Sequence, residues 1–459
     1  MMNIVVLAAG MGKRMRSKLP KVLQPLAGRP MIEHVLDCVG TLEGVRPVVV
    51  VGHGADVLRA RLENRPELHF ATQMPQLGTG HALKCALDAL DMEAPRTVVC
   101  LGDVPLLKPA TLKALATEGG DDDLVIVTVR LDNPKGYGRI VRQDGRVVSI
   151  VEEKDATDDE RRITEVNTGI MRFPTARLEG WLSELKNENA QGEYYLTDVI
   201  GLAVRDGVRI LTVSPEHLYE VEGVNSKVQL AALERTHQRA VAASLLEQGV
   251  TLADPDRIDV RGELTCGSDV FIDVGCVFEG SVHLADGVTV GPYCVIRDAD
   301  VAEGTEILAY THVDDAVVGP ECRIGPFSRL RPKTRLLGGN HIGNFVEVKK
   351  SEVGEKTKIN HLTYVGDSVI GRRVNVGAGV ITCNYDGANK WTTTIGDDAF
   401  IGSGVKLVAP VTVGEMATIG AGGTLRKDAP ANALTVIVGK QVVKEGWKRP
   451  VKAPVKKNI

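Results

Sequence analysis

Aliphatic residues recur every six positions through residues 261–428 of this chain. The series runs from Ile272 to Val376, and each step of eleven divides into five plus six at an intermediate aliphatic residue such as Val301. Two positions before each of these slots stands a small or β-branched residue, with Asn340 as the exception. A six-residue period is typical of a parallel β-helix, in which each coil stacks on the one before. We therefore predict a β-helix of hexapeptide repeats, with both sets of positions facing inward.

The period is interrupted at Thr382–Thr394 and has recovered by Ile419 and Leu425. An insertion between two coils is usually a functional loop, because surface connections tolerate extra residues and carry binding groups. We expect this loop to belong to a site on the β-helix.

The first half of the chain has a different pattern. Over residues 1–225 short apolar runs alternate with stretches of helical period, which predicts an α/β domain, Rossmann-like, with a mostly parallel sheet. An apolar stripe over residues 226–248, ended by Gly249, predicts one helix. The predicted organisation is a domain over 1–225, a helical linker over 226–250, and the β-helix with a basic tail over 251–459. The apolar runs are Ile4–Ala8, Val48–Val51, Val98–Leu101, Leu124–Val129 and Val147–Val151.

Composition narrows the class of protein. With 459 residues and a formal charge of −4, the chain needs more than one core and has no general attraction for nucleic acid or membranes. Its start lacks the basic region and cleavage site of a signal peptide, and no apolar run reaches the ~20 residues of a membrane span. The cytoplasm is therefore the default compartment. A solvated terminus is the favoured explanation of the basic tail, which holds Lys444, Lys448, Arg449, Lys452, Lys456 and Lys457.

The eight cysteines include no Cys-x-x-Cys pair. Cys276, Cys294 and Cys322 occupy small inward positions of the repeat, and Cys266 falls on an aliphatic slot. We expect buried, reduced side chains in a reducing compartment, in preference to disulfides or zinc ligands.

Ligands of α/β sheets bind beyond the carboxyl ends of the strands. The first such end carries a glycine loop, Gly10–Gly12, followed by Lys13 and Arg14, with Lys21 further on. Glycine backbone and these cations suit a phosphate group. The loop is not a Walker loop, which closes on Gly-Lys-Ser/Thr, and Met15 replaces the third glycine of the dinucleotide fingerprint. A tight strand-to-helix turn is the alternative explanation.

Two further strand ends carry polar groups. The segment Gln73–His81 places amides before a glycine-rich turn that opens a helix, and amides suit base edges while helix starts suit anions. Asp103 follows Gly102 after a buried strand, where a carboxylate is a natural ligand for Mg²⁺ bound to phosphates. A cap on the next turn is the alternative role of Asp103.

The six-residue register also places outward side chains. Aliphatic slots one coil apart share a face, so Arg331 and Lys349, each just after such a slot, stack at one corner. Such cations can bind a phosphate group, and the His361 imidazole can act as a general base. We expect Glu347 to orient the imidazole. The register also brings Asn344 and Tyr364 to this corner.

Short motifs follow one another along nearly the whole chain: Leu7–Gly12, Pro20–Leu23, Gln73–Ala82, Gly102–Leu106, Gly136–Arg139, Asn167–Gly169, Glu222–Asn225, Asn344–Glu347, His361–Tyr364 and Ile381–Lys390. In this order they resemble one family, the bacterial bifunctional N-acetylglucosamine-1-phosphate uridylyltransferases and glucosamine-1-phosphate N-acetyltransferases. The resemblance implies a left-handed β-helix, a homotrimer with sites between subunits, and synthesis of UDP-N-acetylglucosamine for peptidoglycan and lipopolysaccharide precursors.

For the first half the resemblance implies uridylyl transfer, in which N-acetylglucosamine 1-phosphate attacks the α-phosphate of UTP and expels pyrophosphate. Arg14 and Lys21 would be the catalytic cations, and Asp103 with Asn225 would bind Mg²⁺. Such a reaction needs positioning and charge neutralisation more than a protein nucleophile. The nucleotide and sugar would be held by Leu7, Ala8, Ala9, Gly10, Lys21, Gln73, Gly78, Thr79, Gly138, Glu152, Asn167 and Asn225.

For the second half the resemblance implies acetylation of glucosamine 1-phosphate by acetyl-CoA, with His361 as the base. The sugar phosphate would be held by Arg331, Lys349, Tyr364 and Asn375. The residues that would line the acetyl-CoA site are Ala378, Asn384, Tyr385, Ser403 and Ala421.

One pair of residues departs from the family pattern. Ile437-Val438 stands where the family usually shows Ser-Arg before Gly-Lys-Gln. That arginine is expected to contact a phosphate of coenzyme A, so we expect weakened acetyl-CoA affinity unless Lys440 or a cation of the tail compensates.

Two other hypotheses come from different classes. One is a single-activity sugar nucleotidyltransferase whose β-helix serves oligomerisation or regulation, and the His361 corner and the Asn384-Tyr385 loop argue against it. The other is a non-catalytic β-helix binding module fused to a degenerate nucleotide fold, and intact Lys21, Asp103 and Asn225 argue against that.

Overall fold

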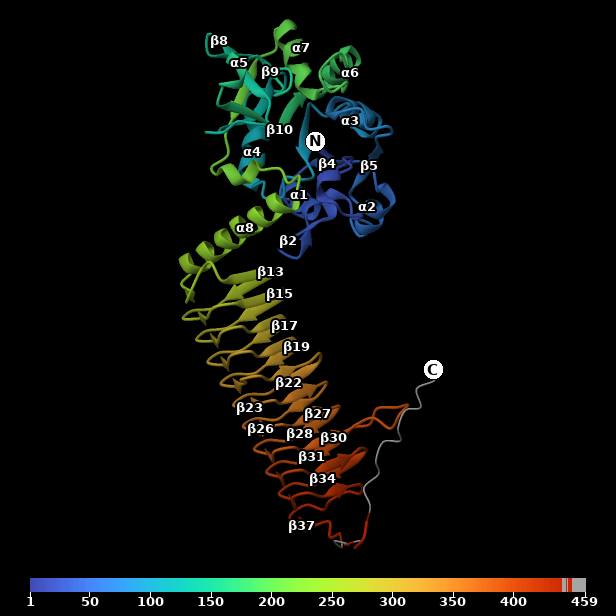
Figure 1. The fold of residues 1–459 in the computed structure, drawn as a ribbon, viewed down its shortest axis with the longest axis vertical. Helices are drawn as coiled ribbons and strands as arrows, with labels where there is room; N and C mark the ends of the chain where they lie inside the picture. Colours follow the sequence, from blue (N-terminus) through green and yellow to red (C-terminus); the bar gives the residue numbers. More distant parts are fainter. Residues whose placement is uncertain (440–442, 444, 448–459) are drawn as a thin grey trace, which may run out of the picture. The chain divides into compact units, whose positions relative to one another are not determined.

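The computed structural model describes residues 1–439, 443 and 445–447. The chain divides into two compact units, one made of Met1–Ser244 with Ile258–Gly262 and the other of Leu245–Arg257 with the described residues from Glu263 onward. Figure 1 shows an α/β unit in blue to green and a stack of coils in yellow to red. Lys440 and the cations of the basic tail lie outside the described residues.

The α/β unit is built on one large sheet. Its strands are β1 Met2–Leu7, β4 Val45–Val51, β5 His69–Thr72, β6 Arg96–Leu101, β7 Leu124–Arg130, β8 Arg139–Gln143, β9 Arg146–Val151, β10 Glu165–Pro174 and β11 Ile210–Val213, beside a small pair, β2 Pro25–Leu26 and β3 Arg29–Pro30. The main order is β11-β7-β10-β6-β1-β4-β5. Only β10 runs antiparallel to its neighbours on this path, which confirms the mostly parallel prediction. The β8–β9 hairpin joins the sheet at β10.

Helices cover both faces of this sheet. Val48 and Val49 on β4 point to opposite cores, as the two-residue period of a strand requires, so the strand is apolar on both sides. The Val49 core holds residues of α1 (Met31–Gly40), α2 (Ala55–Arg61) and α4 (Pro109–Thr117). The Val48 core holds residues of α3 (Thr79–Ala86), α6 (Thr175–Glu184) and α7 (Val199–Arg205). The remaining helices are α5 (Asp158–Arg161) and α8 (Lys227–Glu247), and α8 is the one helix predicted over 226–248.

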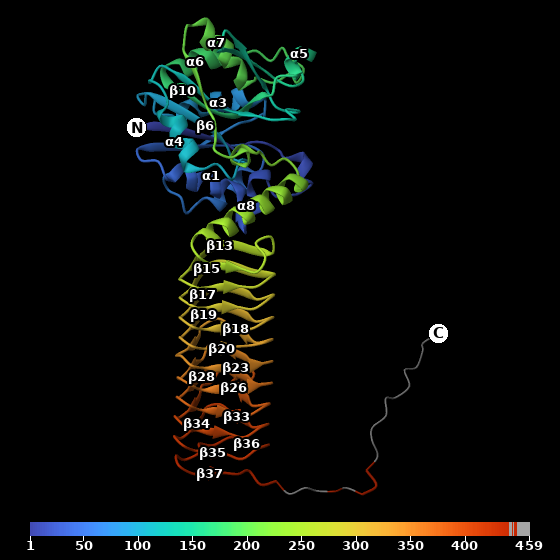
Figure 2. The same cartoon turned by 90° about the vertical axis from the view of Figure 1, so that its left-hand side faces the viewer.

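The second unit is a parallel β-helix, as the six-residue period predicts, and Figure 2 shows its coils side by side. Strands of one face pair in parallel from coil to coil. They are β12 Thr251–Leu252, β14 Phe271–Ile272, β16 Thr289–Val290, β18 Glu306–Ile307, β20 Arg323–Ile324, β23 His341–Asn344, β26 Lys358–His361, β29 Asn375–Val376, β32 Phe400–Ile401, β35 Thr418–Ile419 and β37 Leu434–Thr435.

In the first coils, one long strand per coil forms the rest of the β-helix wall. Beyond β19, two short strands per coil take its place, and they form two separate branches of the sheet. The long strands are β13 Ile258–Cys266, β15 Cys276–Leu284, β17 Val295–Val301 and β19 His312–Val318. One branch holds β21 Arg329–Leu330, β24 Glu347–Lys349, β27 Tyr364–Gly366, β30 Ile381–Cys383, β33 Lys406–Val408 and β36 Thr424–Leu425. The other holds β22 Thr334–Leu336, β25 Glu352–Val353, β28 Ser368–Ile370, β31 Thr393–Ile395 and β34 Val411–Val413.

The core of the β-helix follows the predicted register. All the aliphatic slots from Ile272 to Val376 are buried, and so are the small positions two residues before them. The exception, Asn340, is also buried, and its amide donates to Gly354 O at 2.7 Å while its oxygen accepts from Gly338 N at 3.0 Å. A buried amide with both groups paired costs little stability.

One detail of the sequence pattern needs correction. Cys266 is only partly buried, whereas Cys276, Cys294 and Cys322 are buried as expected. The reason is that β13 has a paired neighbour on one side only, at the start of its sheet. The buried repeat resumes at Ile395, directly after the predicted interruption at Thr382–Thr394.

Candidate functional sites

The carboxyl ends of β1 and β6 lie side by side in the α/β unit. Leu7 pairs with Leu101, and Gly102 N donates to Leu7 O at 2.9 Å. A Cβ on Gly102 would lie 3.2 Å from both Leu7 O and Val22 Cγ1, which is tighter than most side chains tolerate. Glycine at this position therefore lets Asp103 follow immediately beside the end of β1.

The glycine loop after β1 folds against Lys21. Gly12 has a left-handed φ of 56°, and a Cβ there would lie only 2.6 Å from Lys21 Cβ. The next residues, Lys13–Met15, form a single 3₁₀ turn. The loop is thus a tight turn, as the alternative explanation held, and it also brings a cation to the end of the strand.

Lys21 links the two residues expected to bind a metal. Its ammonium forms an ion pair with Asp103 Oδ2 and donates to Asn225 Oδ1 at 3.0 Å. The following helix, α4, has Lys108 at its N-cap position, so Asp103 does not cap it. The carboxylate faces the cation, which removes capping of that helix as an explanation for Asp103.

The donor set beside Lys21 fits Mg²⁺. The oxygens of Asp103 and Asn225 converge on one cationic group, and carboxylate and amide oxygens are ligands that Mg²⁺ accepts. Mg²⁺ usually takes only one or two protein ligands and fills its octahedron with phosphate oxygens and water. Across the described part of the chain, no group of three or more His, Cys, Asp or Glu side chains is arranged to hold a metal.

A cavity of about 400 Å³ opens beside the end of β1. Gln73 is buried in its wall, with Nε2 donating to Gly78 O at 2.8 Å, and Thr79 Oγ1 accepts from Leu196 N at 3.2 Å. Backbone from a glycine loop, an amide and a helix start therefore surround one space. Of the residues predicted for the nucleotide, this cavity is lined by Leu7, Ala8, Ala9, Gly10, Lys21, Gln73, Gly78 and Thr79.

A second cavity of about 350 Å³ shares Leu101 and Asp103 with the first. The two spaces therefore meet at the Asp103 carboxylate, beside the Lys21 ammonium. The residues predicted for the sugar and triphosphate that line the second cavity are Arg14, Gly138, Glu152, Asn167 and Asn225. The structure thus brings every residue predicted for the first site to one bipartite cleft.

Glu152 is the acidic group inside the second cavity. Burial raises the pKa of its carboxyl group, nearby acidic side chains raise it further, and a hydrogen bond from Thr197 Oγ1 at 2.9 Å opposes the rise. The carboxyl oxygens of Glu152 can accept hydrogen bonds from a ligand in this cavity.

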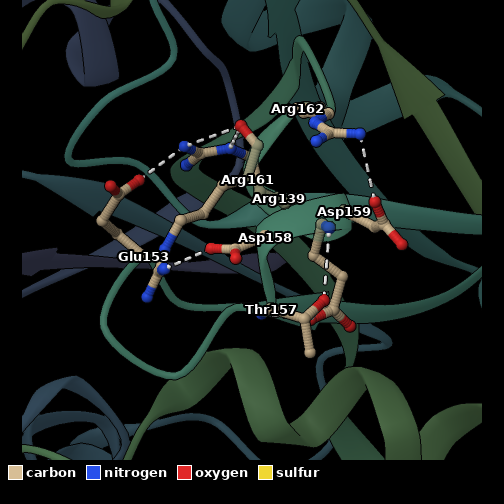
Figure 3. Close-up of polar contacts among 8 residues, drawn as sticks. Arg139, Glu153, Thr157, Asp158, Asp159, Arg161 and Arg162 are labelled. Atoms are coloured by element: carbon tan, nitrogen blue, oxygen red, sulfur yellow. Dashed lines mark hydrogen bonds and ion pairs between the residues drawn. The ribbon is translucent and has the colours of Figure 1, made fainter.

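The start of β8, directly after Gly138, is fixed by a buried arginine. Arg139 is almost fully buried, and its Nη1 donates to the carbonyl oxygen of Tyr137. Its Nη2 donates to the carbonyl oxygen of Arg161 and pairs with Glu153 (Figure 3). Removing this cation would leave two carbonyl oxygens and the Glu153 carboxylate without a donor that they now share. Arg139 therefore holds the wall of the second cavity and does not line it.

Sequence reasoning missed three polar residues of this cleft. Gln76 and Glu193 line the first cavity, and Thr197 holds Glu152. Gln76 belongs to the motif Gln73–Ala82. Glu193 lies in a loop and Thr197 in the short 3₁₀ helix Leu196–Asp198, and neither segment has a periodic pattern. Their contribution follows only from the fold.

The second candidate site lies at a corner of the β-helix. Asn344 pairs in register with His361, and Asn344 Oδ1 lies 3.2 Å from the exposed His361 ring at Nδ1. Glu347 pairs in register with Tyr364, and Lys349 with Gly366. The hexapeptide register therefore places these side chains as predicted.

The expected role of Glu347 is wrong. Its carboxylate accepts from Arg331 Nη1 at 2.7 Å, and the polar partner of the His361 ring is Asn344. The cation one coil away attracts the carboxylate, whereas the strand register sets Asn344 directly beside the imidazole.

A third cation joins the two predicted for the sugar phosphate. Lys390 lies against Lys349, and this neighbour, together with burial and Arg331, holds the pKa of the Lys349 ammonium below its usual value. Positive charges held together in this way favour an anion between them. Lys390 sits in the insertion, where the repeat gives no register, so the sequence pattern did not locate it.

Small residues continue the His361 position down the next coils. Ala378, Ser403 and Ala421 each stand two residues after an inward aliphatic slot, as His361 does, and Gly404 N donates to Ala378 O while Gly422 N donates to Ser403 O, both at 2.8 Å. They form one exposed or half-exposed row at the corner that follows β29, β32 and β35. Such a row leaves room for an extended ligand.

The insertion carries the other predicted acetyl-CoA residues. Asn384 is buried and donates to Asp367 Oδ2 at 2.6 Å, while Tyr385 is exposed. Tyr385 and Lys390 form an antiparallel bridge that makes the loop a small hairpin. Asn375 pairs in register with Lys358 and Phe400, one position before the slot on its face.

The departure from the family pattern lies near this row. Ile437 packs towards Gly423, because a Cβ on that glycine would meet Ile437 Cδ1 at 2.8 Å. Val438 is 87% exposed, so its side chain has no packing role in the described structure.

The α/β unit with its cleft belongs to the class of nucleotidyltransferase domains. A family model for the MobA-like NTP transferase domain matches residues 4–169, which contain β1, Lys21, Gln73 and Asp103. No helix among the described residues has the length and apolar character needed to cross a membrane.

Full-length comparison defines the family. The bifunctional protein GlmU of Azoarcus sp. (strain BH72) is 59% identical over 452 residues, covering 98% of this chain and 100% of that protein. The protein of the same name from Aromatoleum aromaticum is 59% identical, covering 98% and 99%. That from Bordetella parapertussis is 58% identical over 456 residues, covering 98% and 100%. This chain belongs to the family of bifunctional GlmU proteins.

Proposed function

We propose that this chain makes UDP-N-acetylglucosamine in two steps, one in each unit. The β-helix transfers acetyl from acetyl-CoA to glucosamine 1-phosphate, and the α/β unit transfers uridylyl from UTP to the N-acetylglucosamine 1-phosphate that results. The observation that carries the proposal is a pair of sites, each with cations suited to phosphate. Lys21 and Arg14 line the two adjoining cavities of the α/β unit, and Lys349 lies beside Arg331 and Lys390 on the β-helix. Membership of a family named for two functions supports both steps.

In the α/β unit, UTP occupies the first cavity and the sugar phosphate the second. A phosphate oxygen of the sugar attacks the α-phosphorus of UTP, the bond to the β-phosphate breaks, and pyrophosphate leaves. Lys21 and Arg14 neutralise charge on the triphosphate, and Lys21 lies at the junction of the cavities, beside the reacting phosphates. Glu152 and Asn167 orient the sugar from the opposite wall.

Asp103 and Asn225 are the residues that would hold Mg²⁺. Bound Mg²⁺ would neutralise phosphate charge and align the triphosphate for in-line attack. The Lys21 ammonium, which pairs with Asp103 and Asn225 in this structure, would then exchange these partners for phosphate oxygens.

In the β-helix, the amine of glucosamine 1-phosphate attacks the thioester carbon of acetyl-CoA. His361 takes the proton lost by the amine, the carbon–sulfur bond breaks, and the coenzyme A thiolate leaves and is protonated. Asn344 orients the imidazole through its side-chain oxygen at 3.2 Å. Arg331, Lys349 and Lys390 hold the sugar phosphate, with Tyr364 and Asn375, and the row Ala378, Ser403 and Ala421 accommodates acetyl-CoA with Asn384 and Tyr385.

We further propose that the enzyme is a cytoplasmic homotrimer. An exposed aromatic ladder supports the assembly: Tyr293, Tyr310, Phe327 and Phe345 stack on successive coils with ring centroids 4.9–5.6 Å apart, next to the coil of His361. Each has a left-handed φ, which costs a large side chain ~1–2 kcal/mol, so the ladder needs a compensating gain such as burial against another copy.

Separate variants test the two steps. Asp103→Ala should lose uridylyl transfer by at least ~100-fold and keep acetyl transfer, because the cation-binding carboxylate is gone from one site only. His361→Ala should do the opposite. Both activities are measured on each full-length variant, with oligomeric state checked by sedimentation. Loss of both activities in His361→Ala with assembly intact would contradict two independent sites, and a wild-type chain without acetyl transfer would favour the single-activity hypothesis.

A further inference from the structure

The Gln73 side chain is held in one orientation. Its Nε2 donates to Gly78 O at 2.8 Å and lies 3.2 Å from His81 Nδ1, so both amide hydrogens have acceptors. A backbone carbonyl can only accept, which fixes Nε2 on that side of the amide. The oxygen Oε1 is then the group left to face a ligand, and it can only accept a hydrogen bond.

An acceptor at this place distinguishes the two pyrimidines. Uracil carries a hydrogen on N3 and can donate it to Oε1, whereas cytosine N3 is itself an acceptor and would oppose it. A flipped Gln73 amide would suit cytosine, but it would place Oε1 against Gly78 O and His81 Nδ1. Both of those bonds would then be lost to repulsion between acceptors.

We propose that His81 is a positioning residue that selects uridine over cytidine nucleotides by fixing the Gln73 amide. The proposal rests on the uridylyltransferase function proposed above. It adds a residue that does not line the nucleotide cavity and acts only through Gln73.

The place of His81 in α3 supports this role. Neighbours along the turn face two different spaces: Gly78 and Thr79 line the nucleotide cavity, whereas His81 lines another cavity of about 470 Å³ with Lys84 and Cys85. The imidazole therefore stands behind Gln73, on the side away from the nucleotide.

The other ring nitrogen of His81 supports an accepting Nδ1. Nε2 lies 3.6 Å from Cys85 Sγ, and a proton on Nε2 leaves the Nδ1 lone pair for Gln73. Burial raises the pKa of the Cys85 thiol, although Lys84 lowers it, so the sulfur stays neutral. The neutral sulfur can accept the Nε2 proton weakly, which agrees with the tautomer that the Gln73 amide requires.

The test compares variants that remove or keep the acceptor. His81→Leu removes it, and His81→Asn keeps an oxygen near the position of Nδ1. Lys84→Met is the control, because Lys84 lies on the same helix and lines the same cavity, while the Gln73 amide bonds to Gly78 and faces His81. For each full-length variant, kcat/KM is measured with UTP and with CTP, and binding of both nucleotides with Mg²⁺ is measured by calorimetry.

We expect His81→Leu to lower the ratio of kcat/KM for UTP to kcat/KM for CTP about 5- to 10-fold, which is the value of one lost hydrogen bond. The change should lie in KM more than in kcat. His81→Asn should keep most of the ratio and Lys84→Met all of it. An equal loss for both nucleotides in His81→Leu would overturn the proposal and indicate a structural role. A folded His81→Asn variant that no longer discriminates between UTP and CTP would also overturn the proposal. This second variant keeps the test decisive if His81→Leu does not fold.

Failure of the proposed function is recognised separately. If the wild-type chain binds UTP more tightly than CTP yet transfers no uridylyl group, the function fails while the binding ratios still test His81. If the wild type does not discriminate between the nucleotides, the proposal for His81 is wrong whatever the activity.

Discussion

Lys349 lies among cations, and that predicts an unusual pH dependence. Lys390, burial and Arg331 lower the pKa of its ammonium, so Lys349 loses its charge at a lower pH than an ordinary lysine. The KM for glucosamine 1-phosphate should therefore begin to rise at a less alkaline pH than a normal lysine would give. Lys390→Met should raise the pKa of Lys349 and move that rise to higher pH, while increasing KM about 10-fold at neutral pH because one phosphate partner is lost.

The pH profile of KM checks this prediction, with Lys186→Met, an exposed lysine of the other unit, as the control. A profile that keeps its position in Lys390→Met would show that the two ammonium groups do not interact in the free enzyme.

Val438 is the other single position with a measurable consequence. Its exposed side chain stands where the family usually has an arginine, so Val438→Arg should restore a contact with a coenzyme A phosphate. We expect the KM for acetyl-CoA to fall roughly 5- to 10-fold, with kcat little changed. This is less than the full value of a charge-assisted hydrogen bond, because the position is exposed to solvent. Val443→Arg adds the same charge at another exposed valine and should have a smaller effect. An unchanged Michaelis constant in Val438→Arg would end the idea.

At the scale of elements, periodicity determined what could be predicted. The six-residue register gave the β-helix and brought Asn344 beside His361, because strands that pair coil on coil carry equivalent positions to one place. Lys390 was missed because the insertion has no period. Glu347 was misassigned because register places a Cα and does not say which neighbour a long carboxylate will choose.

The α/β unit shows the same limit. Apolar runs located its strands, but they do not give direction, so the antiparallel β10 and the β8–β9 hairpin were not foreseen. Asn167 lies on β10, Arg139 begins β8, and Glu152 directly follows β9. Asn167 and Glu152 line the second cavity, and Arg139 supports its wall. Motifs therefore named the residues of the cleft, and only the fold showed that they line two spaces that meet at Asp103.

At the scale of the whole molecule, the aromatic ladder links assembly to one activity. Its large side chains end at Leu362, and the equivalent positions of the next coils are Gly379, Gly404 and Gly422, also with positive φ. The corner is therefore bulky before His361 and open after it. We infer that a second copy packs on the bulky part and leaves the open part for acetyl-CoA.

Charging the ladder should separate the two activities. The double variant Phe327→Glu and Phe345→Glu should turn the trimer into monomers, because an interface would have to bury unpaired carboxylates. Acetyl transfer should then fall by at least ~100-fold, while uridylyl transfer stays within about 2-fold because its cleft lies inside one α/β unit. Met416→Glu, at an exposed apolar position with the same left-handed φ outside the ladder, is the control and should stay trimeric. The measurements are sedimentation and both activity assays. A double variant that remains a fully active trimer would place the contact between subunits on another face. A monomer with normal acetyl transfer would show that each copy holds a complete site.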